Sequence, residues 1–284
     1  MTTYEPITLG LFLLLSLSVG SFIGLFVFRF PKILESHEQS DQHLLPMLLS
    51  HTKSSTSLVS PRSHCDHCRN PISIHENIPV LSFILLKGKC SSCNESIPAQ
   101  YLIIELATAF AGLGVLLKFG LTYEAIPFYV LICALIALSF IDLNHKILPD
   151  QITLPLIWLG LLTNLVFGFK PLEDAVLGAI LGYLSLWVIF WIYNLLTDKE
   201  ALGFGDFKLL AAMGAWFGFY ALSWILFIAA LTALIFALSQ ILLRRRSFND
   251  PVAFGPFISL AAVIYLFFQN EITQSVGLYL RSYA

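Results

Sequence analysis

The sequence predicts an all-α polytopic membrane protein with about eight transmembrane helices. Of its 284 residues, 57% are hydrophobic and only 12% are charged, whereas soluble proteins carry about 25% charged residues. Charge-poor runs of roughly twenty residues recur along the chain, and each can cross a hydrocarbon core of about 30 Å as a helix. The composition therefore excludes a soluble globular protein. The net charge of −2 gives no indication of a nucleic-acid partner.

The N-terminal segment, residues 1–29, is expected to form the first transmembrane helix, because Ile7–Phe28 contains twenty-two residues without a charge. No Lys or Arg precedes this run and no small-residue cleavage site follows it, so we interpret it as an uncleaved helix. Residues 30–100 are polar and contain four paired cysteines, which predicts one extramembrane domain. Residues 101–284 are expected to form a membrane domain of seven helices.

The helices of the membrane domain follow from its charge-poor runs. Runs that fit one helix are Tyr101–Leu117, Ala125–Ile141, Gln151–Phe169, Ala175–Thr197 and Val252–Phe268. The run Leu209–Leu243 would be about 52 Å long as a single helix, so two helices are expected. A tight turn near Gly218 would separate them. The first of the two would begin near Gly205, which puts Asp206 in its first turn.

The positions of Lys and Arg set the expected orientation, because these residues concentrate in cytoplasmic loops. With the N-terminus outside, thirteen of the sixteen fall on the cytoplasmic side. Only Lys118, Lys170 and Arg281 fall on the other side. This bias places residues 30–100 in the cytoplasm.

Two acidic residues fall at membrane boundaries on that same side. Asp206 opens one helix after Gly203 and Gly205, and Asp142 follows the run that ends at Ile141. A charged acid costs about 2.5–3.5 kcal/mol at the bilayer centre and less near the interface, so such residues are functional candidates. Asp142 and Asp206 are expected at similar depth, on helices that can be neighbours.

If these carboxyl groups meet, their chemistry is constrained. Two carboxyl groups in a poorly solvated site share a proton, so one can deprotonate a water while the other protonates a scissile amide. This is the arrangement of an aspartic protease. Alternatively, each acid caps a helix, which suits Asp206 at a helix N-terminus but not Asp142 at a C-terminus. Ion coupling is a third role that the residues leave open.

The four paired cysteines form two Cys-x-x-Cys motifs, Cys65 with Cys68 and Cys90 with Cys93. Four thiolates suit a tetrahedral Zn²⁺ ion, and a cytoplasmic location favours a metal over disulfides. With four protein ligands the zinc would be structural, stabilising a small polar domain. The alternative is four reduced cysteines without a metal.

The sequence Gly203-Phe204-Gly205-Asp206 matches the Gly-x-Gly-Asp signature of intramembrane aspartyl proteases, and the chain resembles the bacterial type IV prepilin peptidases. The resemblance covers residues 18–262 and is carried by Gly20-Ser21-Phe22, Asn77-Ile78-Pro79, Ile141-Asp142-Leu143, Leu148-Pro149-Asp150, Gly203 to Trp216, and Phe254-Gly255-Pro256-Phe257. It implies an enzyme of the bacterial inner membrane with a periplasmic N-terminus. Asp142 and Asp206 would be its catalytic pair, cutting after a glycine at the cytoplasmic face.

The resemblance also implies substrates and a second activity. The substrates would be type IV prepilins or the pseudopilins of type II secretion. The second activity would be N-methylation of the new N-terminus with S-adenosylmethionine as methyl donor. The residues themselves do not locate a methyl-donor site, because no Gly-x-Gly-x-x-Gly motif is present. A peptidase without methylation and an ion-coupled transporter are the alternative functions.

Three further charged residues have open roles. Lys208 faces away from Asp206 on a regular helix, so it can tune the acids or bind lipid phosphate. Asp150 is expected to cap the helix that opens at Gln151. Glu105, at the cytoplasmic end of the second span, can serve the methylation site, orient the cytoplasmic domain or pair with a Lys.

Overall fold

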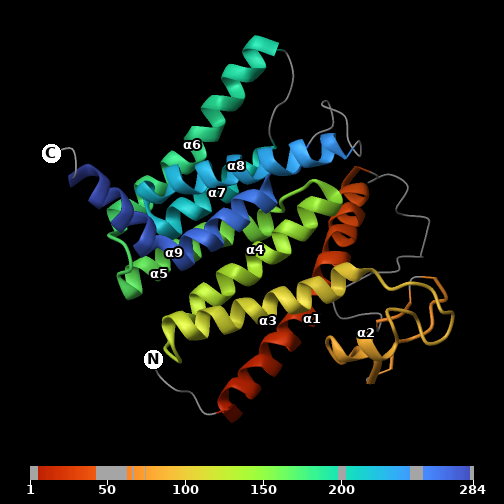
Figure 1. The fold of residues 1–284 in the computed structure, drawn as a ribbon. Helices are drawn as coiled ribbons and strands as arrows, with labels where there is room; N and C mark the ends of the chain where they lie inside the picture. Colours follow the sequence, from red (N-terminus) through yellow and green to blue (C-terminus); the bar gives the residue numbers. More distant parts are fainter. Residues whose placement is uncertain are drawn as a thin grey trace. The chain divides into compact units, whose positions relative to one another are not determined.

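The computed structural model describes residues 6–42, 63–65, 67–73, 75–197, 203–243 and 252–281, and the regular structure of these residues is helical apart from two isolated β-bridges (Figure 1). The expected all-α fold is thus confirmed. Several basic residues that enter the orientation argument lie outside the described ranges: Lys53, Arg62, Lys199 and Arg244 to Arg246. The chain divides into two compact units, unit 1 (Met1–Leu121) and unit 2 (Thr122–Ala284).

Unit 1 is built on two long helices that pack against each other, α1 (Pro6–Gln42) and α3 (Ala99–Phe119). The segment between them contains a short 3-10 helix, η2 (His75–Asn77), and one short α-helix, α2 (Leu81–Leu85). Helix α1 continues well past residue 29, the expected end of the first span. Arg29 and Lys32 end the apolar run that can lie in a membrane, but charged residues do not end a helix. Pro31 lacks an N–H and so removes a backbone hydrogen bond, yet α1 continues through it.

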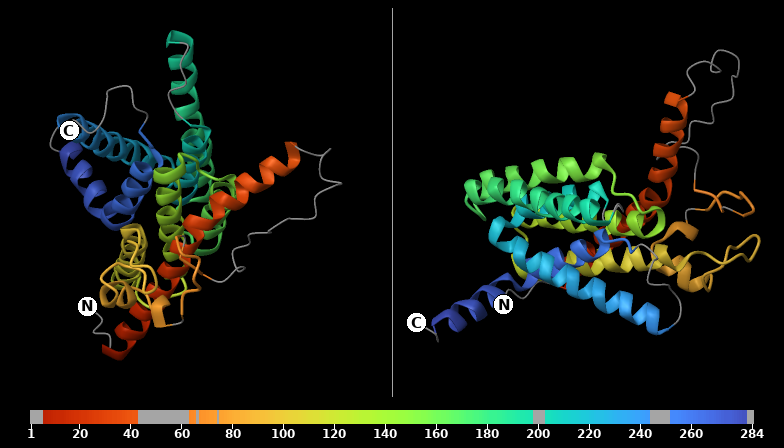
Figure 2. Two further views of the ribbon diagram at one scale, coloured as in Figure 1. Left: turned by 90° about the vertical axis from the view of Figure 1, so that its right-hand side faces the viewer. Right: turned by 90° about the horizontal axis from the view of Figure 1, so that it is seen from above.

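Six helices are found in the described residues of unit 2. They are α4 (Ala125–His145), α5 (Asp150–Phe167), α6 (Leu172–Thr197), α7 (Phe204–Phe217), α8 (Phe219–Leu242) and α9 (Gly255–Arg281). Helix α7 is central, because it packs against α5, α6, α8 and α9. From Asp206 to Phe217 every residue of α7 except Lys208 is buried. Figure 2 shows α6 extending beyond the other helices of this unit.

Seven helices of the described chain are long and apolar enough to cross a membrane: α1, α3, α4, α5, α6, α8 and α9. The eighth expected span is α7, which has only 14 residues and is therefore about 21 Å long. It is too short to cross a bilayer alone and is enclosed by its neighbours instead. The turn expected near Gly218 is confirmed, since α7 ends at Phe217 and α8 starts at Phe219.

Small residues bring α6 and α7 into backbone contact. Gly178 and Gly182 lie one turn apart on α6 and face Gly214 and Leu210 of α7. A Cβ atom on Gly182 would lie 2.6 Å from the Leu210 carbonyl oxygen. This is the small-xxx-small packing by which membrane helices approach closely without a hydrophobic driving force between them.

The C-terminal end of α7 is fixed by side chains of α5. The Asn164 amide donates to the carbonyl oxygens of Ala215 at 2.8 Å and Trp216 at 3.2 Å, and the Trp216 indole donates to the Leu156 carbonyl at 2.9 Å. Carbonyls at a helix end have no partner within the helix, so the two bonds from Asn164 satisfy groups that hydrocarbon would leave unpaired. Helix α7 is therefore held at the end opposite Asp206.

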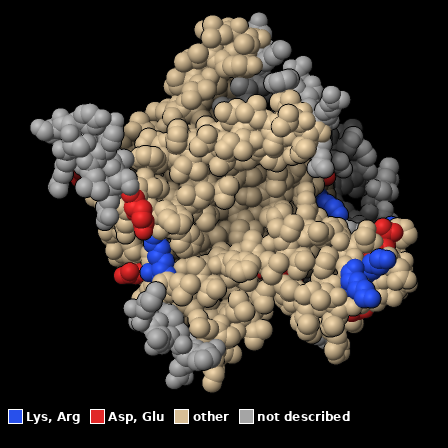
Figure 3. Space-filling model, in the orientation of Figure 1, with Lys and Arg blue, Asp and Glu red and all other residues tan. Residues whose placement is uncertain are grey.

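The protein surface fits an apolar surrounding. On the face shown in Figure 3, the charged side chains of the described residues are confined to a few groups, and the rest of the described surface there is uncharged. Large apolar side chains are exposed along the helices, such as Trp158 on α5, Leu195 on α6 and Phe227 on α8. Apolar exposure of this extent indicates contact with lipid. The chain is a multi-pass membrane protein.

Candidate active site and metal centre

Asp206 lies in the first turn of α7, with Gly203 as the residue that precedes the helix. Its N–H donates to the Gly203 carbonyl at 3.1 Å, and its carboxylate is hydrogen-bonded by the Gly203 backbone. The side chain is only 7% exposed, and its Oδ1 atom has no hydrogen-bond partner within the described part of the chain. A capping role for Asp206 therefore explains a hydrogen bond to one carboxylate oxygen, but it does not explain why the other oxygen, Oδ1, is buried without a partner among the described residues.

Asp142 lies in the last turn of α4, which continues to His145, and is 5% exposed. Its Oδ2 atom accepts a hydrogen bond of 3.0 Å from the backbone N–H of Gly255, the first residue of α9. A negative charge is unfavourable at the C-terminus of its own helix but favourable at the N-terminus of another. The N-terminus of α9 thus stabilises the negative charge of Asp142, which the C-terminus of α4 disfavours.

Asp142 and Asp206 lie around one residue, Leu148, which contacts both Gly205, the neighbour of Asp206, and Gly255, the hydrogen-bond donor to Asp142. Leu148 packs beside both. A Cβ atom on Gly205 would lie 2.6 Å from Leu148 Cβ, and one on Gly255 would lie 2.7 Å from Asp142 Oδ2 and 3.1 Å from the Leu148 methyl groups. Glycine at positions 205 and 255 therefore lets Leu148 close the space between the two acidic helix ends.

The other two predicted polar residues of unit 2 bind each other. The Lys208 ammonium donates to both carboxylate oxygens of Asp150, at 2.6 and 2.7 Å. Asp150 is the first residue of α5, so this ion pair ties the start of α5 to the first turns of α7. The segment that runs from Asp142 to Asp150 is thus anchored at both ends beside the acid pair. Both side chains are partly exposed, so the pair is worth at most about 1 kcal/mol.

Two residues of this site were not predicted as site residues. Gly255 is 113 residues from Asp142 in the sequence, and no local periodicity links them. The only available signal was Phe254-Gly255-Pro256-Phe257 as part of the family resemblance, which does not say what the glycine contacts. For Leu148 the signal was likewise its place in Leu148-Pro149-Asp150 as part of the family resemblance, which does not say that this side chain packs between Gly205 and Gly255.

The four paired cysteines of unit 1 form a compact cluster. Their sulfur atoms all lie within 4.8 Å of one another, with Cys65 and Cys93 at 3.8 Å and Cys68 and Cys90 at 4.0 Å. These separations are far longer than a disulfide bond. They fit four thiolates around one tetrahedral ion at metal–sulfur distances of about 2.3 Å, which would separate the sulfurs by about 3.8 Å.

The two Cys-x-x-Cys turns share one backbone design. In each, the N–H of the first cysteine bonds to a carbonyl five residues on, and the residue after the second cysteine, Arg69 or Asn94, has a φ near +57°. Backbone N–H groups of Cys93 and Ser92 hydrogen-bond the Cys90 sulfur and lower the pKa of this thiol to about 7. The second turn therefore favours the thiolate form of Cys90, the form that binds metal ions.

Glu105 belongs to unit 1 and is buried in α3. Its Oε2 atom accepts a 2.8 Å hydrogen bond from the Val80 N–H, and Ser21 of α1 bonds the same carboxylate. Val80 has a φ of +61°, which is strained for a β-branched residue. Of the three roles open for Glu105, the structure favours orienting the polar segment that precedes α2.

These features define a multi-pass membrane protein with a buried pair of carboxyl groups on helix ends and a separate four-cysteine cluster. Two family models match the chain. Residues 14–119 match the bacterial peptidase A24 N-terminal domain, and residues 129–238 match the type IV leader peptidase family. The chain belongs to the type IV leader peptidase family.

Similar proteins cover nearly the whole chain. A prepilin leader peptidase/N-methyltransferase from Aeromonas salmonicida is 42% identical, over 93% of this chain and 92% of the relative. Proteins of the same name from Pseudomonas aeruginosa and Neisseria gonorrhoeae are 41% and 38% identical, over 93% and 99% of this chain and 91% and 97% of the relatives. No solved structure shows significant similarity.

Proposed function

We propose that this protein is a membrane aspartic endopeptidase that removes the leader of type IV prepilins or of type II secretion pseudopilins, and that it then N-methylates the new N-terminus. The observation that carries the peptidase assignment is the pairing of Asp142 and Asp206, two buried carboxyl groups brought from different helices into one site. The names and identity of the relatives support both activities.

The geometry suits general acid–base hydrolysis. Asp142 is oriented through Oδ2 by Gly255, and Asp206 keeps Oδ1 unpaired in a buried site. The ionised carboxylate of the pair takes a proton from a water while the water oxygen bonds to the scissile carbonyl carbon. The protonated carboxyl group donates its proton to the leaving amide nitrogen, and the carbon–nitrogen bond breaks. The products are a leader that ends in a carboxylic acid and a protein with a new amine, so the pair ends with one proton, as it began.

We propose a location in the bacterial inner membrane, with the N-terminus periplasmic and the acid pair at the cytoplasmic face. The bias of Lys and Arg in the sequence supports this orientation. Asp142 and Asp206 lie at helix ends rather than at mid-helix. Such a depth suits a substrate whose apolar helix lies in the bilayer and whose basic leader lies in the cytoplasm, where it is cut after a glycine.

We propose that the cluster of Cys65, Cys68, Cys90 and Cys93 holds a structural Zn²⁺ ion. All four ligand positions of a tetrahedral ion are then protein sulfurs, so the metal stabilises the polar segment and has no open position for a substrate. S-adenosylmethionine would supply the methyl group for the second activity.

The peptidase assignment is tested with purified protein and a prepilin substrate. Asp142→Asn and Asp206→Asn should each lower the cleavage rate by a factor of about 10² to 10⁴, the usual contribution of a general acid or base. Glu173→Gln, an exposed acid in the first turn of α6, is the matched control and should cleave normally. Normal cleavage by either Asp variant would disprove the acid-pair mechanism.

The two alternatives give different results in the same preparation. A peptidase without the second activity would cleave but transfer no labelled methyl group to the product. An ion-coupled transporter would not cleave at all, and its acids are expected near the bilayer midplane. Asp142 lies in the last turn of α4, a helix long enough to cross a membrane, and this position near a membrane boundary favours the peptidase.

A further inference from the structure

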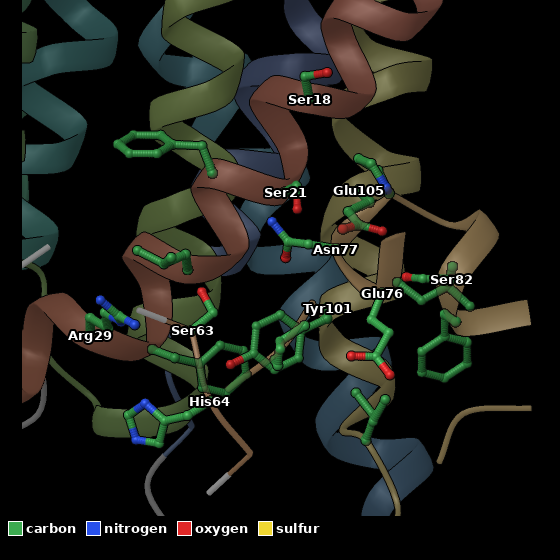
Figure 4. A pocket seen from close by; sticks show the side chains of 18 of the residues that line it. Ser18, Ser21, Arg29, Ser63, His64, Glu76, Asn77, Ser82, Tyr101 and Glu105 are labelled. Atoms are coloured by element: carbon green, nitrogen blue, oxygen red, sulfur yellow. The ribbon is translucent and has the colours of Figure 1, made fainter. Parts of the chain in front are cut away.

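Unit 1 contains a pocket of about 510 Å³ between α1, the start of α3 and the segment around η2 and α2 (Figure 4). This volume lies within the range of small-molecule and cofactor sites, roughly 300–1,000 Å³. None of the acid pair's helices contributes to its lining, so the peptidase mechanism does not account for the pocket.

The pocket carries both signs of charge on different elements. Arg29 and Lys32 line it from α1, whereas Glu76 lines it from η2 and Glu105 from α3. In Figure 4, Ser21 and Glu105 lie next to each other, while Arg29 and His64 lie apart from them. A ligand that carries a carboxylate and positive charges at separate positions matches such a distribution.

Aromatic rings provide the apolar part of the lining. Phe28 of α1 and Tyr101 of α3 both line the pocket and stack with ring centroids 4.3 Å apart, and Phe83 of α2 lines it as well. Aromatic faces bind flat heterocycles by stacking and attract cations such as a sulfonium group. The pocket thus combines surfaces for a zwitterion, a cation and a planar ring.

One wall of the pocket is held rigidly. Glu105 accepts the hydrogen bond from Val80, and this bond fixes a residue in a left-handed conformation directly after Pro79, which lines the pocket. Strain of this kind persists where the surroundings over-determine it and is concentrated at ligand sites. We therefore regard Glu105 as a positioning residue for this wall.

We propose that this pocket binds S-adenosylmethionine, which resembles the described ligand in its amino-acid end, sulfonium and adenine. Arg29 or Lys32 would face the ligand carboxylate, Glu76 would face its positive charges, and the aromatic side chains would contact the adenine. The inference rests on the proposed methyltransferase function and assigns it a site in unit 1. The carboxylates disfavour a polyphosphate ligand such as ATP.

Photolabelling tests the location without relying on a variant. The full-length protein in lipid nanodiscs is irradiated with methyl-labelled S-adenosylmethionine, digested and sequenced. Label is expected in peptides that contain Phe22 to Phe28, Phe83 or Tyr101, and unlabelled S-adenosylhomocysteine should prevent it whereas ATP should not. Label confined to peptides of unit 2 would overturn the assignment.

Equilibrium dialysis with the same ligand tests the charges. Glu76→Gln and Lys32→Gln should each weaken binding about tenfold or more, because each removes a charge-assisted contact. Glu95→Gln and Lys87→Gln are matched controls: both residues are exposed, lie in the same segment and do not line the pocket. All four variants should retain prepilin cleavage, which verifies folding.

The results of these experiments distinguish an error in the location of the donor site from an error in the proposed methyltransferase function. Changes below twofold for both Glu76→Gln and Lys32→Gln, in a protein that binds the donor and methylates, would overturn the pocket and leave the proposed function intact. A wild-type protein that cleaves prepilin but neither binds the donor nor methylates would overturn the methyltransferase function, and the pocket assignment with it.

Discussion

The two units hold their polar groups in place by different means. In unit 2, Asp142 and Asp206 are positioned by close helix packing and by backbone groups at helix ends. In unit 1, charged side chains line an open pocket, and the polar segment is held by two cysteine turns and the bond from Glu105 to Val80. Proton transfer between carboxyl groups needs a site with little water, whereas a charged ligand needs exposed counter-charges. The contrast predicts that the two activities can be damaged separately.

The largest separable effect is expected from the cysteine cluster. Replacing Cys65 and Cys90 together by serine removes one ligand from each turn, so metal binding should weaken at least about 100-fold. His64, which precedes Cys65, and Ile72, which follows Cys68 by four residues, line the pocket, so donor binding should be lost as well. Metal content, donor binding and prepilin cleavage are measured on the full-length protein.

Cleavage should remain within about threefold of wild type in that double variant. Cys133→Ser serves as the control, since Cys133 lies in α4 and outside the cluster. If cleavage were lost together with the metal, the two units would depend on each other, and the prediction that the two activities can be damaged separately would be wrong.

A smaller effect, confined to unit 2, is expected from its glycines. Gly205→Ala and Gly255→Ala press a methyl group against Leu148 or Asp142, so kcat/KM for cleavage should fall about 10- to 100-fold. Gly203→Ala should cost less than about threefold, because its Cβ would lie an ordinary 3.7 Å from Asp206 and its backbone is extended. Equal losses at all three positions would contradict the role assigned to Leu148.

The packing of α6 on α7 should control stability more than chemistry. Gly182→Ala places Cβ 2.6 Å from a backbone carbonyl that cannot move aside, which should lower the free energy of unfolding by about 1–3 kcal/mol. Gly10→Ala is the control, since nothing lies within 4 Å of its Cβ position. Unfolding is followed by loss of helical circular dichroism in mixed micelles. Equal stability of both variants would refute a tight contact.

The smallest effect is expected from the ion pair between Lys208 and Asp150. Lys208→Gln and Asp150→Asn should each reduce cleavage about two- to fivefold, and the double variant should be no worse than either single one. A double-mutant cycle on kcat/KM measures this coupling. Additive losses would mean that each residue acts on its own, for example Lys208 on lipid phosphate.

The sequence predicted the elements that depend on local composition. Uncharged runs located the helices, and the spacing of the cysteines predicted their cluster. It predicted the bounds of α7 but not that this helix would be enclosed by its neighbours instead of forming an eighth span, because helix packing joins segments that are distant in the sequence. Neither the contact of Gly255 with Asp142 nor that of Glu105 with Val80 could be predicted, since each joins distant segments through a backbone N–H that any residue except proline possesses.

The hydrogen bond from Gly255 makes the two acids unequal targets for an inhibitor. Asp142 already has a fixed donor on Oδ2, so a compound that offers it another gains little at that atom. Oδ1 of Asp206 is buried and unpaired within the described chain, and a hydroxyl placed there would satisfy a costly orphan acceptor. A compound with one such hydroxyl on an apolar helical scaffold should therefore bind chiefly through Asp206, and Asp206→Asn should weaken it more than Asp142→Asn.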